Sequence, residues 1–206
     1  MDAAAWNARY ETAGFVWSTE PNQFLATEVS GLAVGHAHDL ACGEGRNAVW
    51  LATRGWDVTG VDFSEVGLTK AVGLAEASGV AERTRWVCAD VTTWEPDGRF
   101  DLVVVMYLHL VAPQRSAAMG VAAQSLATGG TLLVVGHDAT NLAEGVGGPP
   151  DPSVLYGPDD IIGDLAGESD LMVERAERVR RPVSVDTPEG PQERQAIDCL
   201  VRVRRG

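Results

Sequence analysis

The sequence has few cysteines, and none of them are spaced as a disulfide framework or a zinc site would need. Its 206 residues contain three, at Cys42, Cys88 and Cys199, which stand far apart. All three lie in apolar surroundings, so we expect buried free thiols. A reducing, cytoplasmic setting is therefore expected, and no metal centre is predicted.

Long hydrophobic runs and an excess of basic charge are also missing. No apolar stretch approaches the length of a membrane span, and the first residues lack the basic start and apolar core of a secretory leader. Lys and Arg number 16 against 29 Asp and Glu, which gives a formal net charge of −13. Because such a chain repels nucleic-acid phosphates and anionic lipids, neither is expected as a partner.

The composition is otherwise that of an ordinary globular protein, and the length suits a single domain over residues 1–206. After residue 31, strand-like runs alternate with helical patterns. Strands are predicted at residues 34–40, 56–61, 84–88, 100–106 and 131–136. Helices are predicted at residues 23–30, 44–54 and 64–78, and from Pro113 to about Gly129–Gly130. This alternation is typical of a doubly wound parallel α/β sheet.

The pattern changes after residue 138. Residues 139–157 are rich in Gly and Pro and are predicted to form a long loop. A short helix is expected at residues 158–165. Two strand-like stretches, at about 171–181 and 194–204, flank the turn signal at 186–191. The sheet is therefore expected to end in an antiparallel pair.

The strongest candidate for a binding site lies where the first strand turns into the first helix, in the run Asp-Leu-Ala-Cys-Gly-Glu-Gly at residues 39–45. Gly43 and Gly45 let the backbone turn tightly and come close to a ligand. Open parallel sheets bind ligands at the carboxyl ends of their strands. A glycine-rich turn can also be purely structural, so a binding role needs support from the residues that follow the turn.

Two carboxylates follow at the ends of the next two predicted strands. Asp62 stands about 20 residues past the glycines, where it can accept hydrogen bonds from two ribose hydroxyls. Asp90 can accept a hydrogen bond from the exocyclic amine of an adenine. Together they suit an adenosine group. The alternative is that both residues simply cap the elements that follow them.

These segments resemble the ordered motifs of class I S-adenosylmethionine-dependent methyltransferases. The resemblance is carried by residues 38–47, 61–64, 88–91, 100–109 and 126–137. The run at 39–47 is similar to the branch that includes tellurite-resistance and thiopurine methyltransferases. It implies a Rossmann-like, doubly wound, mostly parallel seven-stranded sheet with a C-terminal antiparallel hairpin. It also implies S-adenosyl-L-methionine as the cofactor, which leaves as S-adenosyl-L-homocysteine.

The resemblance also implies roles for individual residues. The glycine turn would line the methionyl part of the cofactor, Asp62 would hold the ribose, Phe63 would stack beside the adenine, and Asp90 would hold the adenine. The full set of candidate cofactor contacts is Trp17, Asp39, Ala41, Cys42, Gly43, Gly45, Arg46, Asn47, Asp62, Phe63, Ser64, Asp90, Val91 and Met106.

Three residues at strand ends are candidates for the chemistry itself. Methyl transfer from a sulfonium needs mainly alignment and exclusion of water, and a base only if the acceptor must lose a proton. His109 and His137 could be that base, and Tyr107 could orient the acceptor. Alternatively, the histidines satisfy loop backbone groups and Tyr107 merely closes the cofactor pocket.

The N-terminal residues 1–30 and the C-terminal residues 139–206 are expected to flank the cofactor-binding core at 31–138. The first segment is aromatic-rich and would form a lid, with Trp17 and the Glu20-Pro21-Asn22 turn over the site, or would pack on the sheet. The last segment would supply the acceptor loop, with Gly147-Gly148 and Tyr156, and the terminal hairpin. Arginines clustered on the last two strands are expected on a solvated face of mixed charge rather than at an anion site.

Several functions remain open at this point. The favoured one is methyl transfer to an O, N or S nucleophile of a small aromatic or heterocyclic molecule, by a monomer or homodimer. A metalloid oxyanion acceptor, with Arg46 in the pocket, is the second. A non-catalytic protein that binds S-adenosylmethionine is the third. An NAD-dependent oxidoreductase is least favoured, because Asp39 would lie close to a pyrophosphate and no third glycine follows.

Overall fold

A seven-stranded sheet forms the centre of the computed structural model, which describes residues 2–12, 14–188 and 190–206. The strand order is β3-β2-β1-β4-β5-β7-β6. The strands are β1 (His36–Leu40), β2 (Asp57–Asp62), β3 (Thr84–Cys88), β4 (Phe100–Met106), β5 (Leu126–His137), β6 (Leu171–Thr187) and β7 (Gly190–Arg205). Strands β1 to β5 are mutually parallel, whereas β7 runs antiparallel to β5 and β6. The predicted fold class is confirmed.

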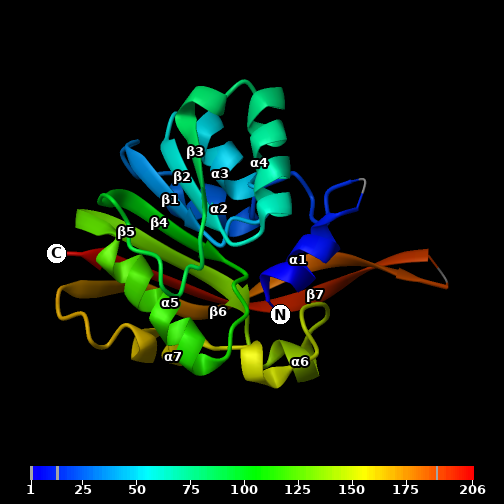
Figure 1. The fold of residues 1–206 in the computed structure, drawn as a ribbon. Coiled ribbons are helices and arrows are strands. Elements are labelled where there is room, and N and C mark those ends of the chain that lie inside the picture. Colours follow the sequence, from blue (N-terminus) through cyan, green and yellow to red (C-terminus); the bar gives the residue numbers. More distant parts are fainter. Residues whose placement is uncertain (1, 13, 189) are drawn as a thin grey trace.

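Helices cover both faces of this sheet (Figure 1). One face carries α2 (Gln23–Val29), α3 (Arg46–Thr53) and α4 (Glu65–Ala77), and the other carries α5 (Ala112–Gln124) and α7 (Pro158–Asp164). Helix α1 (Ala3–Tyr10) lies against α4, and α6 (Asn141–Glu144) follows β5. Short 3₁₀ turns lie at η1 (Ala81–Arg83) and η2 (Pro152–Val154).

Strands β4 and β5 are buried on both faces, which is why their sequences are continuous apolar runs rather than alternating ones. Leu102 to Val105 of β4 and Leu132 to Val135 of β5 have no exposed surface. Leu102 and Val104 pack with Leu51 of α3, while Val103 and Val105 pack with Met119 of α5. The packing on the two faces of the sheet holds β4 and β5 in place, and it thereby sets the positions of the strand ends that carry the candidate site.

The structure differs from the predicted elements at several places. Helix α1 was not expected, and the region at 139–157 contains α6 and η2 rather than only irregular chain. Gly129 and Gly130, expected to end a helix, lie inside β5. A Cβ at Gly130 would stand 2.8 Å from the carbonyl oxygen of Phe100, so the glycine permits the irregular pairing with β4 there.

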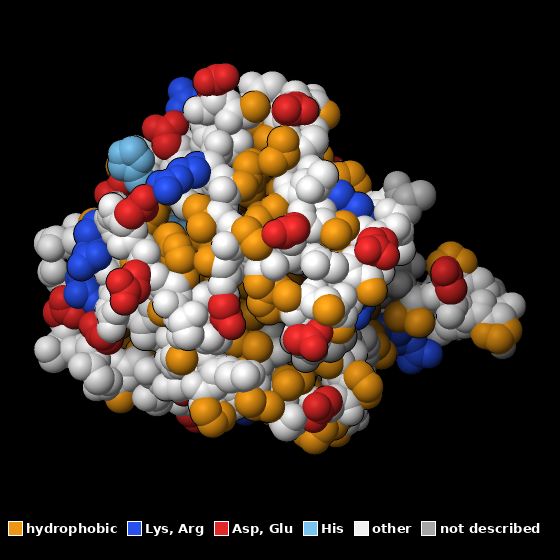
Figure 2. All heavy atoms as spheres, in the orientation of Figure 1, with side chains coloured by type: hydrophobic (Ala, Val, Ile, Leu, Met, Phe, Trp, Pro, Cys, Tyr) orange, Lys and Arg blue, Asp and Glu red, His pale blue; other side chains and the backbone are white. Residues whose placement is uncertain are grey.

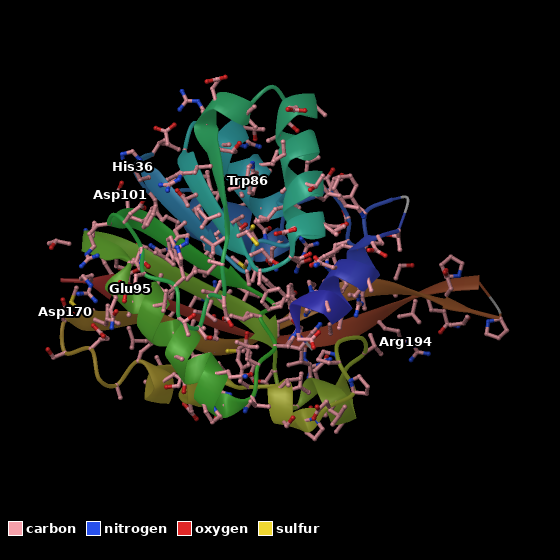
Figure 3. All side chains as sticks on the ribbon, in the orientation of Figure 1. His36, Trp86, Glu95, Asp101, Asp170 and Arg194 are labelled. Atoms are coloured by element: carbon pink, nitrogen blue, oxygen red, sulfur yellow. The ribbon has the colours of Figure 1, made fainter. Side chains whose placement is uncertain are left out.

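Strands β6 and β7 are longer than expected, and their outer half projects from the body of the molecule (Figures 1 and 2). Strand β7 pairs with β5 from Arg204 to Asp198, whereas its pairing with β6 continues to Gly190. Arg194 extends from the projecting part (Figure 3). Glu189, within the predicted turn, lies outside the described residues.

The structure corrects one of the expectations drawn from charge and cysteine content, the burial of Cys88. Acidic side chains are scattered over the face in Figure 2 rather than gathered on it. Within the described residues, no helix is both long and apolar enough to cross a bilayer. Cys42 and Cys199 are buried free thiols as predicted, but Cys88 is exposed. The prediction for Cys88 was wrong because β3 is the edge strand, so its last residue has a neighbouring strand, β2, on one side only.

A buried asparagine ties the chain after β5 to β7. The Asn141 side chain accepts a hydrogen bond from the Ile197 N–H through Oδ1 at 2.7 Å. Its Nδ2 donates to the carbonyl of Gly147 at 2.9 Å. Asn141 therefore holds the glycine-rich loop beside the ends of β5 and β7.

Replacing this residue tests how much the tie contributes to stability. Asn141→Ala is expected to lower the free energy of unfolding by about 2–4 kcal/mol, because it leaves the buried Ile197 N–H unpaired. Urea denaturation measures the change. Gln114→Ala, which removes an exposed amide on α5, is the control and should stay within about 0.5 kcal/mol of the parent. Equal stabilities of the two variants would contradict the assigned role.

Candidate active site

The site lies at the topological switch point between β1 and β4. Helix α3 leaves β1 toward one face of the sheet and α5 leaves β4 toward the other, so the ends of these adjacent strands stay uncovered. Ala41 and Tyr107, the residues that follow the two strands, have φ values of 60° and 58°. Among the described residues they alone combine a side chain with left-handed backbone. Such strain concentrates at functional sites.

The glycine turn is packed so closely that its glycines cannot be replaced freely. Gly43 and Gly45 have φ values of 54° and 82°. A Cβ at Gly43 would lie 2.8 Å from the Tyr10 hydroxyl oxygen, and one at Gly45 would lie 2.6 Å from the Cβ of Ala71. The backbone of Cys42 donates to the Val61 carbonyl at 3.0 Å and thereby joins the turn to β2.

Asp39, near the end of β1, is a buried carboxylate without a partner. Its exposure is 1%, and neither side-chain oxygen has a hydrogen-bond partner within the described chain. Burial raises the pKa of Asp39 from its ordinary 3.8 to about 7, although the proximity of the Ala48 backbone N–H and of the Arg46 guanidinium opposes the shift. A buried carboxylate of this kind is costly unless a cation pairs with it. Asp39 could hold an ammonium group.

Asp62, at the end of β2, holds the glycine turn in place. Its Oδ2 accepts from the Gly43 N–H at 2.9 Å, and its Oδ1 accepts from the Ser64 N–H at 2.8 Å. Burial raises the pKa of Asp62, while these backbone hydrogen bonds oppose the rise. Ser64 caps α4 by accepting from the Gly67 N–H and also donates to Asn7. Each Asp62 oxygen has a second lone pair with which it could hold ribose hydroxyls.

The proposed adenine contacts are mixed in exposure. Phe63 is half-buried, Val91 is buried and Asp90 is exposed. The Asp90 Oδ1 accepts from both the backbone N–H and the hydroxyl of Thr92, at 2.9 and 2.7 Å. Asp90 therefore caps the turn that follows it and has its second oxygen for a ligand.

The side chains of the first two residues of α3 differ in whether they already have a partner within the protein. Asn47 accepts from the Asn22 N–H at 2.8 Å, so it anchors the start of α2. The half-buried Arg46 guanidinium forms no hydrogen bond or ion pair with any residue that the structure describes. Burial lowers the pKa of Arg46, and the proximity of Tyr107 and Asp39 opposes that shift. Arg46 could hold an anionic group, such as a cofactor carboxylate. Met106, buried at the end of β4, precedes Tyr107.

The N-terminal segment is fastened over the glycine turn by Glu44. The Glu44 carboxylate accepts from the backbone N–H groups of Val16 and Trp17, at 2.9 and 3.2 Å, and pairs with Lys70 at 3.0 Å. The Trp17 side chain is 43% exposed and lies under the Arg9 guanidinium. The buried aromatic residue against the turn is Tyr10, which belongs to the same aromatic-rich segment.

The three candidates for the chemistry gather at the ends of β4 and β5. The His137 ring lies 4.9 Å from Tyr107 and 5.4 Å from His109, with the two imidazole planes at 9°. Burial, and secondarily His137, lower the pKa of His109 to about 4. Tyr156 is buried near His109, with the two ring centres 6.4 Å apart. Gly148 of the glycine-rich loop stands directly against His137.

Two residues of this cluster were missed from the sequence. Asp198 of β7 is wholly buried opposite His137, and its Oδ2 accepts from the Tyr107 hydroxyl at 2.9 Å and from Arg181 Nε at 2.8 Å. Its Oδ1 lies 3.1 Å from His137 Nδ1. Burial alone would raise the pKa of Asp198, but hydrogen bonds from His137, Arg181 and Tyr107 lower it. The available signal was a lone acid within the apolar run of β7.

The assignment of the last-strand arginines to a solvated face needs correction at Arg181, which lies inside the cluster. Arg178 stays on the solvated face with 57% of its side chain exposed, although it pairs with the buried Asp138 at 2.9 Å. The mixed-charge face holds for others, including Arg202 with Glu174 and Arg205 with Asp170. The prediction of a solvated face failed at Arg181, because β6 and β7 continue beyond the end of β5 and the Arg181 side chain there meets Asp198.

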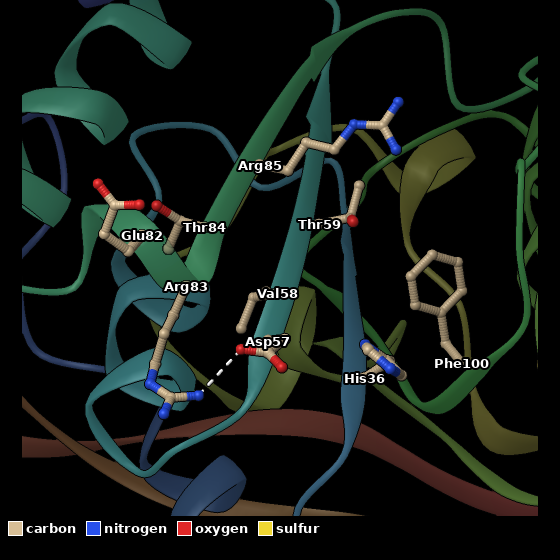
Figure 4. A pocket seen from close by; sticks show the side chains of 9 residues that line it. All are labelled: His36, Asp57, Val58, Thr59, Glu82, Arg83, Thr84, Arg85 and Phe100. Carbon is tan, nitrogen blue, oxygen red and sulfur yellow. Dashed lines mark hydrogen bonds and ion pairs between the residues drawn. The ribbon is translucent and has the colours of Figure 1, made fainter.

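A separate hollow of about 190 Å³ lies at the opposite, amino ends of the strands (Figure 4). Its two arginines are already engaged, since Arg83 pairs with Asp57 at 2.9 Å and Arg85 pairs with Asp97 at 2.8 Å. His36 at its rim donates its backbone N–H to Asp101, and the two side chains lie at the same edge in Figure 3. None of the candidate site residues lines this hollow.

Comparison with known proteins now bears on this geometry. Residues 37–130, which include the glycine turn, match the model of the methyltransferase domain family. The strand order and the inserted antiparallel β7 agree with this match. Residues 37–130 are a methyltransferase domain, in a chain with the fold of class I S-adenosylmethionine-dependent methyltransferases. The prediction of the family from the sequence is thereby confirmed.

Individual relatives agree with this family. The chain is similar to thiocyanate methyltransferase 1 of Arabidopsis thaliana, with 33% identity over 125 residues, which are 60% of this chain and 54% of that protein. The chain thus spans about half the length of that relative. TehB from Haemophilus influenzae has 16% identity and a TM-score of 0.73, covering 99% of this chain and 67% of TehB.

A further solved structure, reported for the conversion of a disulfide bond into a thioacetal group during echinomycin biosynthesis, has a TM-score of 0.75. It is 21% identical and covers 98% of this chain and 91% of its own. Both structural likenesses show the shared fold. Within the described part of this methyltransferase, no three His, Cys, Asp or Glu side chains gather as a metal site would need.

The unpaired Asp39 of the methyltransferase makes a testable prediction about pH. Its pKa is raised in the folded chain, so the folded state binds more protons than the unfolded state between about pH 4 and pH 7. The free energy of unfolding should therefore fall as pH rises through this window, by about 2–4 kcal/mol. Asp39→Asn should remove this fall, as measured by urea denaturation at each pH.

The matched control is Asp186→Asn, at an exposed position of β6. Its stability curve should follow that of the parent. If the parent and Asp39→Asn curves ran parallel from acid to neutral pH, Asp39 would not be the destabilising buried charge described above.

Proposed function

We propose that this chain transfers a methyl group from S-adenosyl-L-methionine to an O, N or S nucleophile of a small aromatic or heterocyclic molecule. The observation that carries the proposal is the unpaired, buried carboxylate of Asp39 beside the strained glycine turn. A cationic amino-acid group would compensate that charge, whereas a pyrophosphate would not. The argument therefore favours S-adenosylmethionine over a dinucleotide.

The chain's own groups would divide the work of holding and aligning the cofactor. When bound, the cofactor supplies a methyl group on a positively charged sulfur. Asp39 would hold the ammonium group, Arg46 the carboxylate and Asp62 the ribose hydroxyls. The segment that Glu44 fastens over the turn would exclude water. Alignment and dehydration of this kind account for much of the rate enhancement available to a displacement reaction.

The preference for an aromatic acceptor rests on the ring cluster at the ends of β4 and β5. Tyr107, His109 and His137 lie within 6.2 Å of one another by their ring centres. Aromatic rings contact one another favourably in stacked or edge-on arrangements. A flat acceptor that entered beside Tyr107 would meet such rings on the side away from the cofactor turn.

A second candidate function has a specific observation in its favour. The unpartnered Arg46 guanidinium could bind a small anion instead of the cofactor carboxylate, and Arg181 lies close enough to act on it electrostatically. The thiocyanate methyltransferase relative is named for an anionic acceptor. A metalloid oxyanion or a similar anion is therefore the alternative acceptor class.

The first test is cofactor binding by calorimetry. S-adenosyl-L-homocysteine should bind with micromolar affinity, and NAD should give no heat of binding. Asp62→Ala should weaken S-adenosyl-L-homocysteine binding by about 1–3 kcal/mol, because the ribose hydroxyls lose their acceptor and the turn loses its anchor. Asp57→Ala, at the other end of β2 with a side chain 55% exposed, is the control and should bind as the parent does.

Each outcome has a consequence. Binding of NAD alone would overturn the proposal. Binding of neither compound would point to a protein without this activity. Binding of S-adenosyl-L-homocysteine without its formation from S-adenosyl-L-methionine, over phenols, heterocyclic amines, thiols, thiocyanate and tellurite, would favour a non-catalytic binding protein.

A further inference from the structure

We propose that Asp198 fixes the tautomer of His137, so that His137 Nε2 removes a proton from the acceptor, and that the acceptor is an O–H, N–H or S–H compound. The inference rests on the proposed function and narrows its acceptor class. In this account Asp198 is a positioning residue, since it acts through His137. A nucleophile that is already an anion, such as thiocyanate, would have no use for this arrangement.

The geometry of Asp198 determines which histidine nitrogen carries the proton. Its Oδ2 already accepts two hydrogen bonds, from Tyr107 and Arg181. Its Oδ1 faces His137 Nδ1 at 3.1 Å. The two atoms do not meet hydrogen-bond geometry in this structure, and neither has another hydrogen-bond partner within the described residues. An ionised carboxylate only accepts hydrogen bonds, so a neutral His137 that turns to pair with Oδ1 places its proton on Nδ1. Nε2 then carries the lone pair that a general base needs.

The groups around His137 favour this state from every side. His109, on the chain after β4, stacks on the imidazole plane and stays neutral because its pKa is lowered to about 4. The Tyr107 ring is tilted by 44° to the imidazole, and its hydroxyl donates to Asp198, as does Arg181 of β6. The nearby Asp138 carboxylate is neutralised by Arg178. The charge of Asp198 is thus held by donors, with His137 as the proton carrier beside it.

The position of His137 leaves Nε2 within reach of a bound molecule. Its side chain is 11% exposed, so the ring is not sealed in the core. On the Nε2 side stands Gly148, where a Cβ would approach His137 Cδ2 to 2.7 Å and Nε2 to 3.1 Å. Gly148 also has a φ of 79°. Glycine at this point of the acceptor loop gives the ring its space.

The proton and electrons balance in one displacement. The acceptor X–H bond gives its proton to His137 Nε2, and the electron pair left on X forms the new bond to the methyl carbon. The methyl–sulfur bond breaks, and its electron pair stays on sulfur. The His137 imidazolium is stabilised by the Asp198 carboxylate and later returns its proton to solvent.

The tautomer can be measured directly in the ligand-free and S-adenosyl-L-homocysteine-loaded protein. Long-range ¹H–¹⁵N correlation spectra of ¹⁵N-histidine-labelled protein at pH 8 distinguish protonated from unprotonated ring nitrogens. The His137 signal is identified by its loss in His137→Gln. The expected state has Nδ1 protonated and Nε2 bare. A proton on Nε2 in the parent protein would overturn the proposal without any acceptor being known.

Asp198→Asn should invert this tautomer. Tyr107 and Arg181 both donate toward one side of residue 198, so the amide oxygen would stay there and the amide NH₂ would face His137. Nδ1 must then accept, and the proton moves to Nε2. Glu193→Gln, at an exposed position of the same strand, should leave the spectrum unchanged. An unchanged His137 signal in folded Asp198→Asn would contradict the positioning role.

The rate of methyl transfer provides a second test of the role of Asp198. With a phenol or thiol acceptor that the parent protein methylates, Asp198→Asn and His137→Gln should lower the rate by about 10²–10⁴-fold. Cofactor affinity should stay unchanged, which separates this loss from a failure of the proposed function. An equal loss with thiocyanate would rule out a base. If the parent methylates none of the panel, the tautomer measurement decides alone.

Discussion

Parallel strands β1 and β4 lie side by side, and the helices that follow them leave toward opposite faces of the sheet. No helix can therefore cover the point where both strands end, and the chain must close this gap with turns. The strained Ala41 and Tyr107 are the first residues of those turns. The glycine turn, the N-terminal segment and the ring cluster are all arranged around this gap.

Two buried carboxylates at this gap have opposite surroundings. Asp198 is surrounded by Tyr107, Arg181 and His137, so its charge is stabilised within the protein itself. Asp39 is equally buried but has no partner among the described residues. An uncompensated charge destabilises the free protein, and a cationic ligand recovers that free energy when it binds. The difference separates a group that organises the protein from one reserved for a ligand.

The core of this fold was predictable because its signals are local. The apolar runs of β4 and β5, the Ser64 cap and the glycine turn each depend on a few adjacent residues. The outer part of β6 was missed because Pro182 usually ends a strand, yet β6 is an edge strand and needs no donor on its open side. Asp198 and Arg181 were missed because their pairing with His137 and Tyr107 joins residues far apart in the sequence.

The contacts of Glu44 with Val16, Trp17 and Lys70 offer a way to follow the N-terminal segment in solution. Lys70 is the single lysine of the chain, and its ammonium group is bound to both Glu44 and the carbonyl of Gly14. The one side-chain amine in the protein is therefore occupied when the segment lies over the turn. Lifting of the segment would remove the Gly14 carbonyl and leave the ion pair with Glu44 of the glycine turn. A change in the reactivity of this amine would then report such a movement without an introduced probe.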